Sequence, residues 1–433
     1  MNTSRAARAA LAVLGPLALA AAAAPASADV LVIGDPNGPL EGSTRPVTLH
    51  LGDGTSRPLA RVTGVLASPL VPSPDRRFVA GASPNGRIRV IATDGRPPRT
   101  FGLPGLSGGA GLAWSRDGAR ITVWGPETRR RRRAVTQTCV LATGACTIAD
   151  ASRTTPVGAL ADGRLFRLAM DPAFPDSSLL DQDTTEWKTQ TAAEIAQVRR
   201  LLRRRFRLTL TLDGRDGGPP IVLRRVRQSL GRGLSIPAGE LGRGAGSTVL
   251  GTVPIRYGLR TRHRDGRLQS RPTLTFGAPS LLRVTPDGQQ RSVPGKQFAF
   301  GDGDLLGLGP LLLPAFAEAT NGDWVTIGGQ RKDHALVRTA FDGRTSPLLV
   351  GGRPASAEVL LSAVGVPAKD TASGREASPA FPIDYESATD SLIVAVDDRR
   401  GRGYVLRVPL SGGRPPTVVV KHAQWQFGGV AAW

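Results

Sequence analysis

Residue types that commonly carry enzyme chemistry are scarce in this chain, which has two cysteines and four histidines among 433 residues. One G-x-S-x-G match, residues 105–109, has the letters of a hydrolase nucleophile turn, which needs a buried strand before it and a helix after it. Here Pro104 precedes the match and the strand-like GLAW, residues 111–114, follows it, so we expect no catalytic serine. No two histidines have the close spacing of paired metal ligands: they are His50, His263, His334 and His422. The sequence predicts no catalytic residue, no metal ligand set and no cofactor.

Acidic side chains gather at two places, DPAFPDSSLLDQDTTE (171–186) and GDGD (301–304). Oxygen-rich loops can hold Ca²⁺, but neither segment has the spacing of a calcium-binding loop. We interpret both as exposed segments kept soluble by their carboxylates. The dipeptide Gly295-Lys296 lacks the other glycine and the Ser or Thr of a phosphate-binding loop.

The two cysteines have the spacing of a disulfide across a hairpin. Cys139 and Cys146 flank the turn in CVLATGAC. In a hairpin centred on Ala142 and Thr143 they face each other across the two strands. Export would place them in an oxidising compartment. The sequence therefore predicts a Cys139–Cys146 disulfide.

The formal net charge is +21, and 51 of the 56 basic residues are arginine. Such a field attracts polyanions, among them nucleic acid, anionic lipid and acidic polysaccharide. The arginines are spread along the sequence with few aromatic residues between them, which favours coding bias toward arginine and argues against nucleic acid as the partner. Five arginines follow one another without a break: Arg129, Arg130, Arg131, Arg132 and Arg133. This run must be exposed because like charges repel, and it forms either a solvated loop or an anion-binding patch.

Residues 1–28 have the features of a signal peptide. Two arginines near the start precede an apolar run, residues 9–21, and the small-residue site Ala26-Ser27-Ala28. The arginines are not adjacent, which favours Sec export over the twin-arginine route. No later stretch has the length of a membrane-spanning helix. We expect an extracellular or periplasmic protein with one domain, residues 29–433, and no transmembrane anchor.

Short polar turns recur between alternating strands along the chain. Each contains Asp or Asn, whose side chains bond to their own backbone, and four of the six contain Gly, which tolerates positive φ. They lie in SPDRRFVA (73–80), SRDGARITV (115–123), LADGRLFRL (160–168), HRDGRLQS (263–270), ATNGDWVTI (319–327) and SATDSLIVA (387–395). Short strands in units of four, repeated six to eight times, predict an all-β fold, a single β-propeller of about seven four-stranded blades.

The phrases SPDRR, SRDG and VLATG resemble the repeats of TolB-like and other tryptophan-aspartate-type β-propellers, in which a W-S-P-D-G turn precedes a strand. The resemblance extends over most of residues 29–433. It implies the propeller fold and protein partners at the cell envelope.

Seven blades of about 43 residues leave about 100 residues for insertions, which we place at 171–205, 224–262 and 361–386. The first contains TAAEIAQVRRLLRRRF (191–206), where apolar residues at helical spacing predict a short helix on the rim of the propeller. These apolar residues are Ile195, Val198 and Leu202.

The two ends of the domain match complementary parts of one blade. DVLVIGD, from Asp29, matches the strand after an Asp-Gly turn, and GGVAAW, at the C-terminus, matches GLAW before that turn, with Trp433 in the place of Trp114. We therefore expect residues 428–433 to pair with residues 29–34 and close the ring, because an open ring would expose strand edges.

We interpret the protein as a secreted binding or scaffold module, a monomer that recognises a protein partner at the cell envelope or outside the cell. Two other classes stay open. One is an extracellular propeller enzyme, either a lyase or a lactonase-type hydrolase, which inward carboxylates and histidines around the channel would favour. The other is an arginine-driven polyanion-binding protein, which a single contiguous arginine face would favour.

Overall fold

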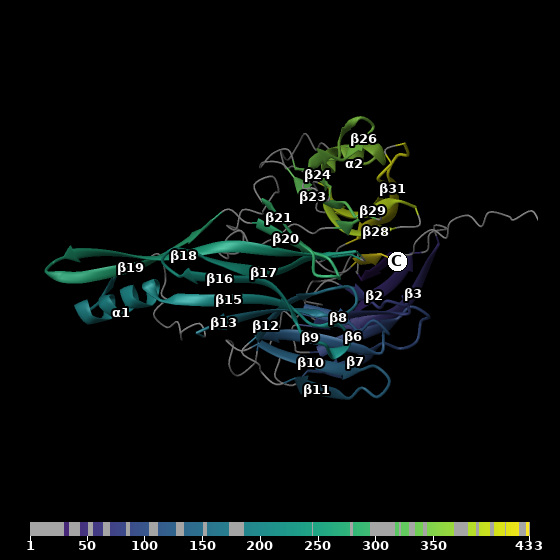
Figure 1. The fold of residues 1–433 in the computed structure, drawn as a ribbon. Coiled ribbons are helices and arrows are strands. Elements are labelled where there is room, and N and C mark those ends of the chain that lie inside the picture. Colours follow the sequence, from purple (N-terminus) through teal and green to yellow (C-terminus); the bar gives the residue numbers. More distant parts are fainter. Residues whose placement is uncertain are drawn as a thin grey trace, which may run out of the picture.

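The computed structural model is an all-β protein in which the described strands form a ring of seven antiparallel blades (Figure 1). The structure describes residues 30–33, 44–50, 55–63, 70–83, 87–103, 111–126, 134–149, 154–172, 186–244, 246–277, 280–294, 317–319, 322–328, 334–340, 344–367, 380–386, 389–398, 402–411, 413–423 and 430–432. The prediction of an all-β propeller with about seven four-stranded blades is confirmed.

The first four blades follow one another along the chain, except that the inner strand of blade 1 comes from the C-terminus. From the inside outward, blade 1 contains β32 (Val430–Ala432), β1 (Val30–Ile33), β2 (Thr44–His50) and β3 (Ser56–Thr63); blade 2 contains β4 (Val71–Pro72), β5 (Phe78–Ser83), β6 (Arg87–Ala92) and β7 (Arg99–Gly102); blade 3 contains β8 (Gly111–Trp114), β9 (Arg120–Pro126), β10 (Ala134–Val140) and β11 (Cys146–Ala149); blade 4 contains β12 (Thr154–Ala159), β13 (Leu165–Asp171), β15 (Arg205–Leu212) and β16 (Ile221–Ser229).

The remaining three blades complete the ring. Blade 5 contains β17 (Leu234–Arg243), β18 (Thr248–Arg264), β20 (Ser280–Val284) and β21 (Gln290–Pro294); blade 6 contains β22 (Ala317–Glu318), β23 (Trp324–Gly328), β24 (Ala335–Thr339) and β25 (Thr345–Pro347); blade 7 contains β28 (Phe381–Glu386), β29 (Ser391–Asp397), β30 (Gly403–Pro409) and β31 (Thr417–Ala423). Between blades 6 and 7 lie the hairpin β26 (Leu349–Val350) and β27 (Arg353–Pro354) and the helix α2 (Ala357–Ala363), so the predicted insertion at 361–386 in fact starts inside a helix.

The two ends of the described chain close the ring. β32 pairs with β1 in antiparallel register, with Val30 opposite Ala432 and Val32 opposite Val430. The inner strands contact one another in the order β32, β4, β8, β12, β17, β22, β28 and back to β32. The predicted closure by pairing of N- and C-terminal strands is confirmed, whereas Trp433 lies outside the described residues.

The hydrophobic core lies between neighbouring blades. One cluster joins blades 2 and 3 through side chains such as Ile88 and Ile121, and another joins blades 4 and 5 through Phe166 and Leu250. Each blade has a neighbour on both faces, so strands in the middle of a blade are buried on both sides. β29 and β30 show this pattern, because five of the seven residues are fully buried in each. Strands in the middle of a blade can therefore read as apolar runs rather than as an alternation of apolar and polar residues.

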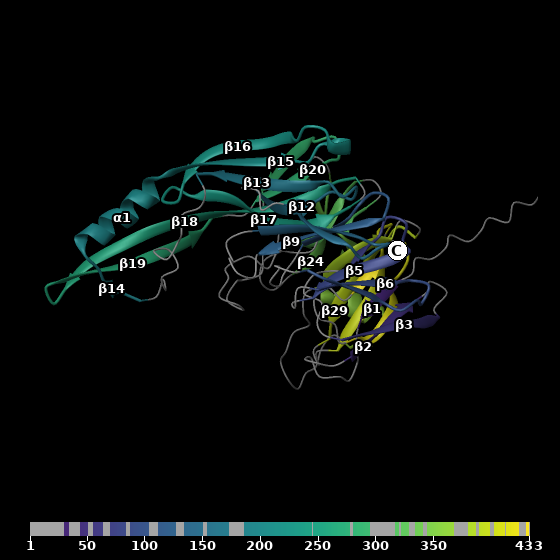
Figure 2. The ribbon, with the colours of Figure 1, turned by 90° about the horizontal axis from the view of Figure 1, so that it is seen from below.

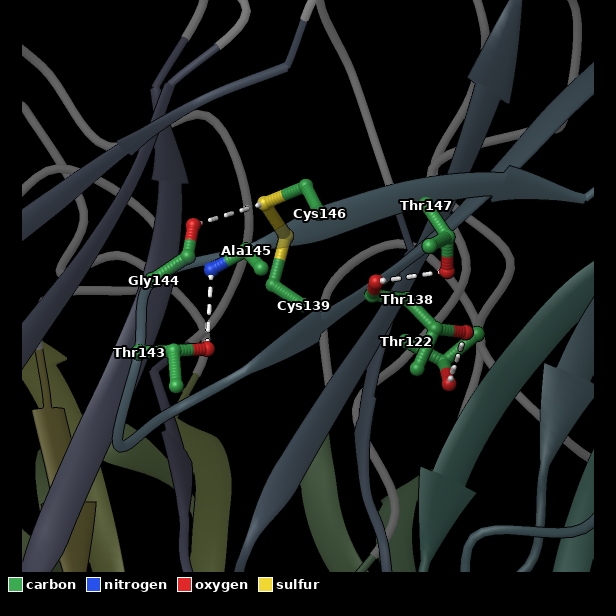
Figure 3. Close-up of a disulfide and its surroundings, with 8 residues drawn as sticks. All are labelled: Thr122, Thr138, Cys139, Thr143, Gly144, Ala145, Cys146 and Thr147. Carbon is green, nitrogen blue, oxygen red and sulfur yellow. Dashed lines mark hydrogen bonds between the residues drawn. A yellow bond between two sulfur atoms is a disulfide. The ribbon is translucent and has the colours of Figure 1, made fainter.

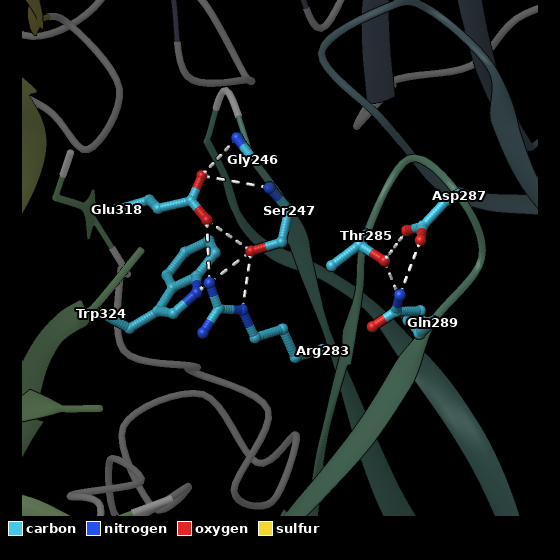
Figure 4. Close-up of polar contacts among 8 residues, drawn as sticks. All are labelled: Gly246, Ser247, Arg283, Thr285, Asp287, Gln289, Glu318 and Trp324. Carbon is cyan, nitrogen blue, oxygen red and sulfur yellow. Dashed lines mark hydrogen bonds and ion pairs between the residues drawn. The ribbon is translucent and has the colours of Figure 1, made fainter. Parts of the chain in front are cut away.

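A buried ion pair joins blade 5 to blade 6 (Figure 4). Arg283 Nη2 donates to Oε1 of Glu318 at 3.1 Å, and the two side chains are 8% and 3% exposed. The other carboxylate oxygen accepts from the backbone N–H groups of Gly246 and Ser247, at 2.8 and 3.1 Å. The Ser247 hydroxyl accepts from Arg283 Nε at 2.8 Å and from Trp324 Nε1 at 3.3 Å. Burial lowers the pKa of the Arg283 guanidinium and the Glu318 charge opposes this, but arginine stays protonated in proteins.

The predicted disulfide joins β10 to β11 at the outer edge of blade 3 (Figure 3). Cys139 and Cys146 are directly opposite in the register, with their Cα atoms 4.0 Å apart. The Cys139 side chain is buried in the cluster between blades 2 and 3. The prediction from the spacing of the two cysteines is confirmed.

We expect the Cys139→Ser/Cys146→Ser variant to fold with a modest loss of stability. The bond closes a loop of eight residues, for which the chain-entropy relation gives roughly 2.5 kcal/mol. Thermal melting of the variant measures this loss, and thiol labelling of the wild-type protein under denaturing, non-reducing conditions should find no free thiol. Two reactive thiols in the wild type, or a variant that fails to fold, would contradict the expectation.

Blades 4 and 5 extend beyond the ring into a projection that we call the arm (Figures 1 and 2). It consists of β14 (Lys188–Thr189), α1 (Ala192–Arg203), β19 (Arg267–Phe276) and the ends of β13, β15, β16 and β18 that lie far from the ring. Its own small core contains Phe206, Leu208, Leu230 and Leu234, with Tyr257 packed against it.

The arm corrects three predictions. The helix lies along β18 in the arm rather than on the rim, and it ends at Arg203 because Phe206 begins the buried alternation of β15. The segment 224–262 is an insertion only in part, because its residues form β16, β17 and most of β18. The turn in HRDGRLQS joins β18 to β19 at the tip of the arm and does not connect strands of a blade.

Candidate functional site

Side chains at the inner strands tie three blades together. Glu240 and Arg243, both on β17, form an ion pair at 2.7 Å. The Glu240 carboxylate accepts from the N–H of Ala159 on β12 at 2.9 Å, and Arg243 Nη2 donates to the carbonyl of Leu112 on β8 at 3.0 Å. The pair thus spans the inner strands of blades 3, 4 and 5, which is a structural role.

The arm concentrates the charge of the protein. Residues 186–276, which include the arm, contain nineteen Lys and Arg against six Asp and Glu, so about a fifth of the chain holds +13 of the total +21. Spread along a sequence, these arginines resemble coding bias. The folded chain instead gathers most of them on one projecting element, although Arg243 lies on the inner strand β17 and Arg215 follows β15 outside the arm.

The hairpin of β18 and β19 carries arginine on one of its two faces, which we call the arginine face. The register places Arg260 directly opposite Arg271, and Arg264 directly opposite Arg267. Like charges that face each other across a ladder destabilise the sheet. The face contains these four and two further residues at alternate positions of β18, Arg256 and Arg262.

Carboxylates do little to neutralise the arginine face. The single ion pair found among its described residues joins Arg264 to Asp265 at the hairpin tip, with 3.6 Å between Nε and Oδ2 and both side chains well exposed. On the opposite side of the arm, Arg207 faces Arg227, but β13 places Asp171 beside Arg207. The β18–β19 hairpin is therefore the more strongly positive of the two sides.

Trp187 holds two members of the arginine face in place. The guanidinium of Arg262 lies 4.1 Å from the centre of the indole ring, and that of Arg271 lies 5.3 Å from it. Arg262 also donates from Nε to the Gln269 side chain at 2.9 Å. Cation–π contacts of this kind fix the guanidinium planes before any ligand arrives, and fixed guanidinium groups lose less entropy when they bind a carboxylate or phosphate.

Within the described chain, the histidines and the acidic residues do not come together in a site. The described histidines lie on different elements, and the described residues hold no group of three or more His, Cys, Asp or Glu placed to bind a metal ion. The described part of the chain also has no helix that is long and apolar enough to cross a membrane. Several candidate segments lie outside the described residues: 105–109, 129–133, 301–304, residues 173–185 of the other acidic segment, and Gly295-Lys296.

The arginine face was not predicted, although the sequence carried a signal for it. The two alternating runs on either side of Asp265 form strands of seventeen and ten residues, longer than the five or six residues that are usual for a strand. Arginine occupies alternate positions on β18 at 260, 262 and 264. A strand that long must leave the blade, and the arginines then share one face.

The chain matches no known family model and no curated protein sequence. Among solved structures it is similar to the β-propeller domain of the Trilobed protease from Pyrococcus furiosus, with 8% identity over 91% of this chain and 94% of that one and a TM-score of 0.43. It is also similar to apo AztD from Citrobacter koseri, with 12% identity over 94% of this chain and 98% of that one and a TM-score of 0.45. A third similar structure is a virginiamycin B lyase from Staphylococcus aureus, with 12% identity over 81% of this chain and 84% of that one and a TM-score of 0.38. Likenesses of this size carry no argument about activity, and the propeller assignment rests on the strand pairing described above.

Proposed function

We propose that this protein is a binding module in which the propeller is the scaffold and the arm is the contact surface for an anionic partner. Export, for which the features of residues 1–28 argue, would present the arm to the cell envelope or the medium. The observation that carries the proposal is the arginine face, where Arg260 opposes Arg271 and Arg264 opposes Arg267. Such pairs cost stability in the free protein, and a bound anion would offset that cost.

The proposal predicts that two exposed arginines are needed for binding and not for folding. Arg260→Ser/Arg267→Ser removes one member of each like-charge pair and leaves Arg262 and Arg271 on Trp187. We expect affinity for heparin and polyglutamate, used as model polyanions, to fall about tenfold or more, because one hydrogen bond to a charged group contributes about 1.5–3 kcal/mol. The slope of log affinity against log salt should become shallower by about 0.7–0.9 for each arginine removed, as it does for each phosphate that a protein no longer neutralises.

The matched control is Arg116→Ser/Arg353→Ser, which removes the same charge from exposed positions on the propeller. It should retain most of the affinity, and both double variants should melt at or above the wild-type temperature. Equal loss of affinity in the two variants would mean that net charge alone attracts the polyanion. That result would contradict a dedicated site on the arm.

A further inference from the structure

A groove lies on the arm between α1 and the face of the β18–β19 hairpin opposite the arginine face. Its volume is about 590 Å³, within the range of pockets that enclose a small ligand or a few side chains. From the helix it is lined by Ala192, Ile195, Ala196, Arg199, Arg200 and Arg203, and from the hairpin by Thr261, His263 and Leu268. Figure 2 shows the helix alongside these two strands.

The groove exists because two of the helix residues that face the hairpin are alanines. Ala192 and Ala196 are one turn apart, so their methyl groups lie on the same side of α1, and both are exposed. Ile195 is only 4% exposed and forms part of the floor with the half-buried Leu268. Longer side chains at the two alanine positions would fill this space.

The rim of the groove has a different chemistry from its floor. Arg199, Arg200 and Arg203 are all exposed on the last two turns of the helix, and no acidic residue is among the described residues that line the groove. A ligand that fits both parts has an apolar group for the floor and several negative charges around it.

We propose that this groove binds an acidic protein segment through one or two apolar anchor side chains. This inference rests on the proposed function and names the class of partner. A sulfated polysaccharide or a nucleic acid backbone matches the rim but offers no aliphatic side chain to the floor. Insertion into a membrane is disfavoured by the tip of the arm, Arg264-Asp265-Gly266-Arg267, which has no apolar side chain.

The test compares two synthetic peptides of about twelve residues and equal charge. Both consist of Asp and Glu except for the two central positions, which are Leu-Leu in one peptide and Ser-Ser in the other. We expect wild-type protein to bind the Leu-Leu peptide at least about tenfold more tightly, because that is the smallest change expected from burying a leucine side chain. Fluorescence anisotropy at fixed salt measures both affinities.

Ala196→Phe fills the groove without changing any charge, and Ala193→Phe is its matched control. Ala193 is exposed on the same helix and does not line the groove. The groove-filling variant should lose the preference for the Leu-Leu peptide and still bind the Ser-Ser peptide, whereas the control should behave as wild type. Melting curves of both variants confirm that the arm stays folded.

The two proposals fail in different ways. Equal affinity of wild type for the two peptides, an unchanged preference in Ala196→Phe, or a loss of heparin, DNA or anionic vesicle binding in Ala196→Phe would overturn the acidic-segment proposal. Affinity for heparin and polyglutamate that does not respond to Arg260→Ser/Arg267→Ser would instead overturn the role of the arginine face. A preference that survives in that double variant and is lost in Ala196→Phe would support the groove alone.

Discussion

Deleting residues 426–433 should lower the free energy of unfolding by several kcal/mol, far more than removal of a terminal tail normally does. The deletion removes β32, the inner strand of blade 1, which pairs with β1 and contacts the inner strands of blades 7 and 2. Without it β1 becomes an unpaired edge and the ring opens between blades 7 and 2, which exposes apolar surface. Chemical denaturation measures the loss.

Removal of residues 1–28 is the control, since they precede every described strand, and it should leave the transition unchanged. A circular permutant that joins the two native ends and opens the chain in a loop of another blade should retain most of the stability. A truncated protein that unfolds at the wild-type denaturant concentration would show that the pairing of β32 with β1 contributes little.

The second large effect is expected at the ion pair between blades 5 and 6. Glu318→Ala removes the carboxylate that hydrogen-bonds to the buried Arg283 guanidinium, which keeps the weaker electrostatic effect of Asp323. It also leaves the N–H groups of Gly246 and Ser247 without their acceptor. Removal of one partner of a buried pair typically costs about 3–5 kcal/mol. We expect a loss in this range in denaturation experiments, and a smaller one in Glu318→Gln, whose amide oxygen can still accept.

Asp94→Asn is the matched control for this variant. Asp94 pairs with Arg96 at 2.7 Å, but both side chains are about half exposed. A hydrogen bond from the Arg96 backbone lowers the pKa of Asp94, and exposed pairs of this kind contribute little to stability. Similar losses in Glu318→Ala and Asp94→Asn would mean that burial does not set the strength of the Glu318 pair.

The sequence was enough to predict the propeller and its disulfide, because both depend on short-range signals. The closure was also predictable, although it pairs Val30 with Ala432, because each end carries a recognisable part of the repeat. In blade 3, Ala119 N–H and the Ser115 hydroxyl both donate to the Asp117 carboxylate, so the turn is specified by residues within four positions. The same local chemistry misled at Asp265, where it makes the tip of the arm hairpin. Local turn residues specify that two strands reverse, but they do not specify whether the strands belong to a blade.

The interactions that were missed depend on partners far apart in sequence. Glu318 and Arg283 are 35 residues apart and meet only because blades 5 and 6 are adjacent. The arginine face depends on the register between β18 and β19. That register cannot be assigned from the sequence until the lengths of the two strands are known. The groove depends on how α1 lies against the hairpin, and helix periodicity predicts the helix but not its neighbour.

β18 is part of both blade 5 and the arm, and it runs from one into the other as a single strand. Near the ring it pairs with β17 and β20, and from Ile255 to Arg264 it pairs with β19 in the arm. Because side chains alternate strictly along a strand, the position of Leu250 in the core of the ring decides which way Arg260 points. One residue inserted between them would turn the arginines toward α1 and the apolar residues toward solvent. The blade end of β18 therefore fixes the orientation of the arm. An insertion that lengthens the arm keeps the arginine face on the same side only when it adds an even number of residues to the strand.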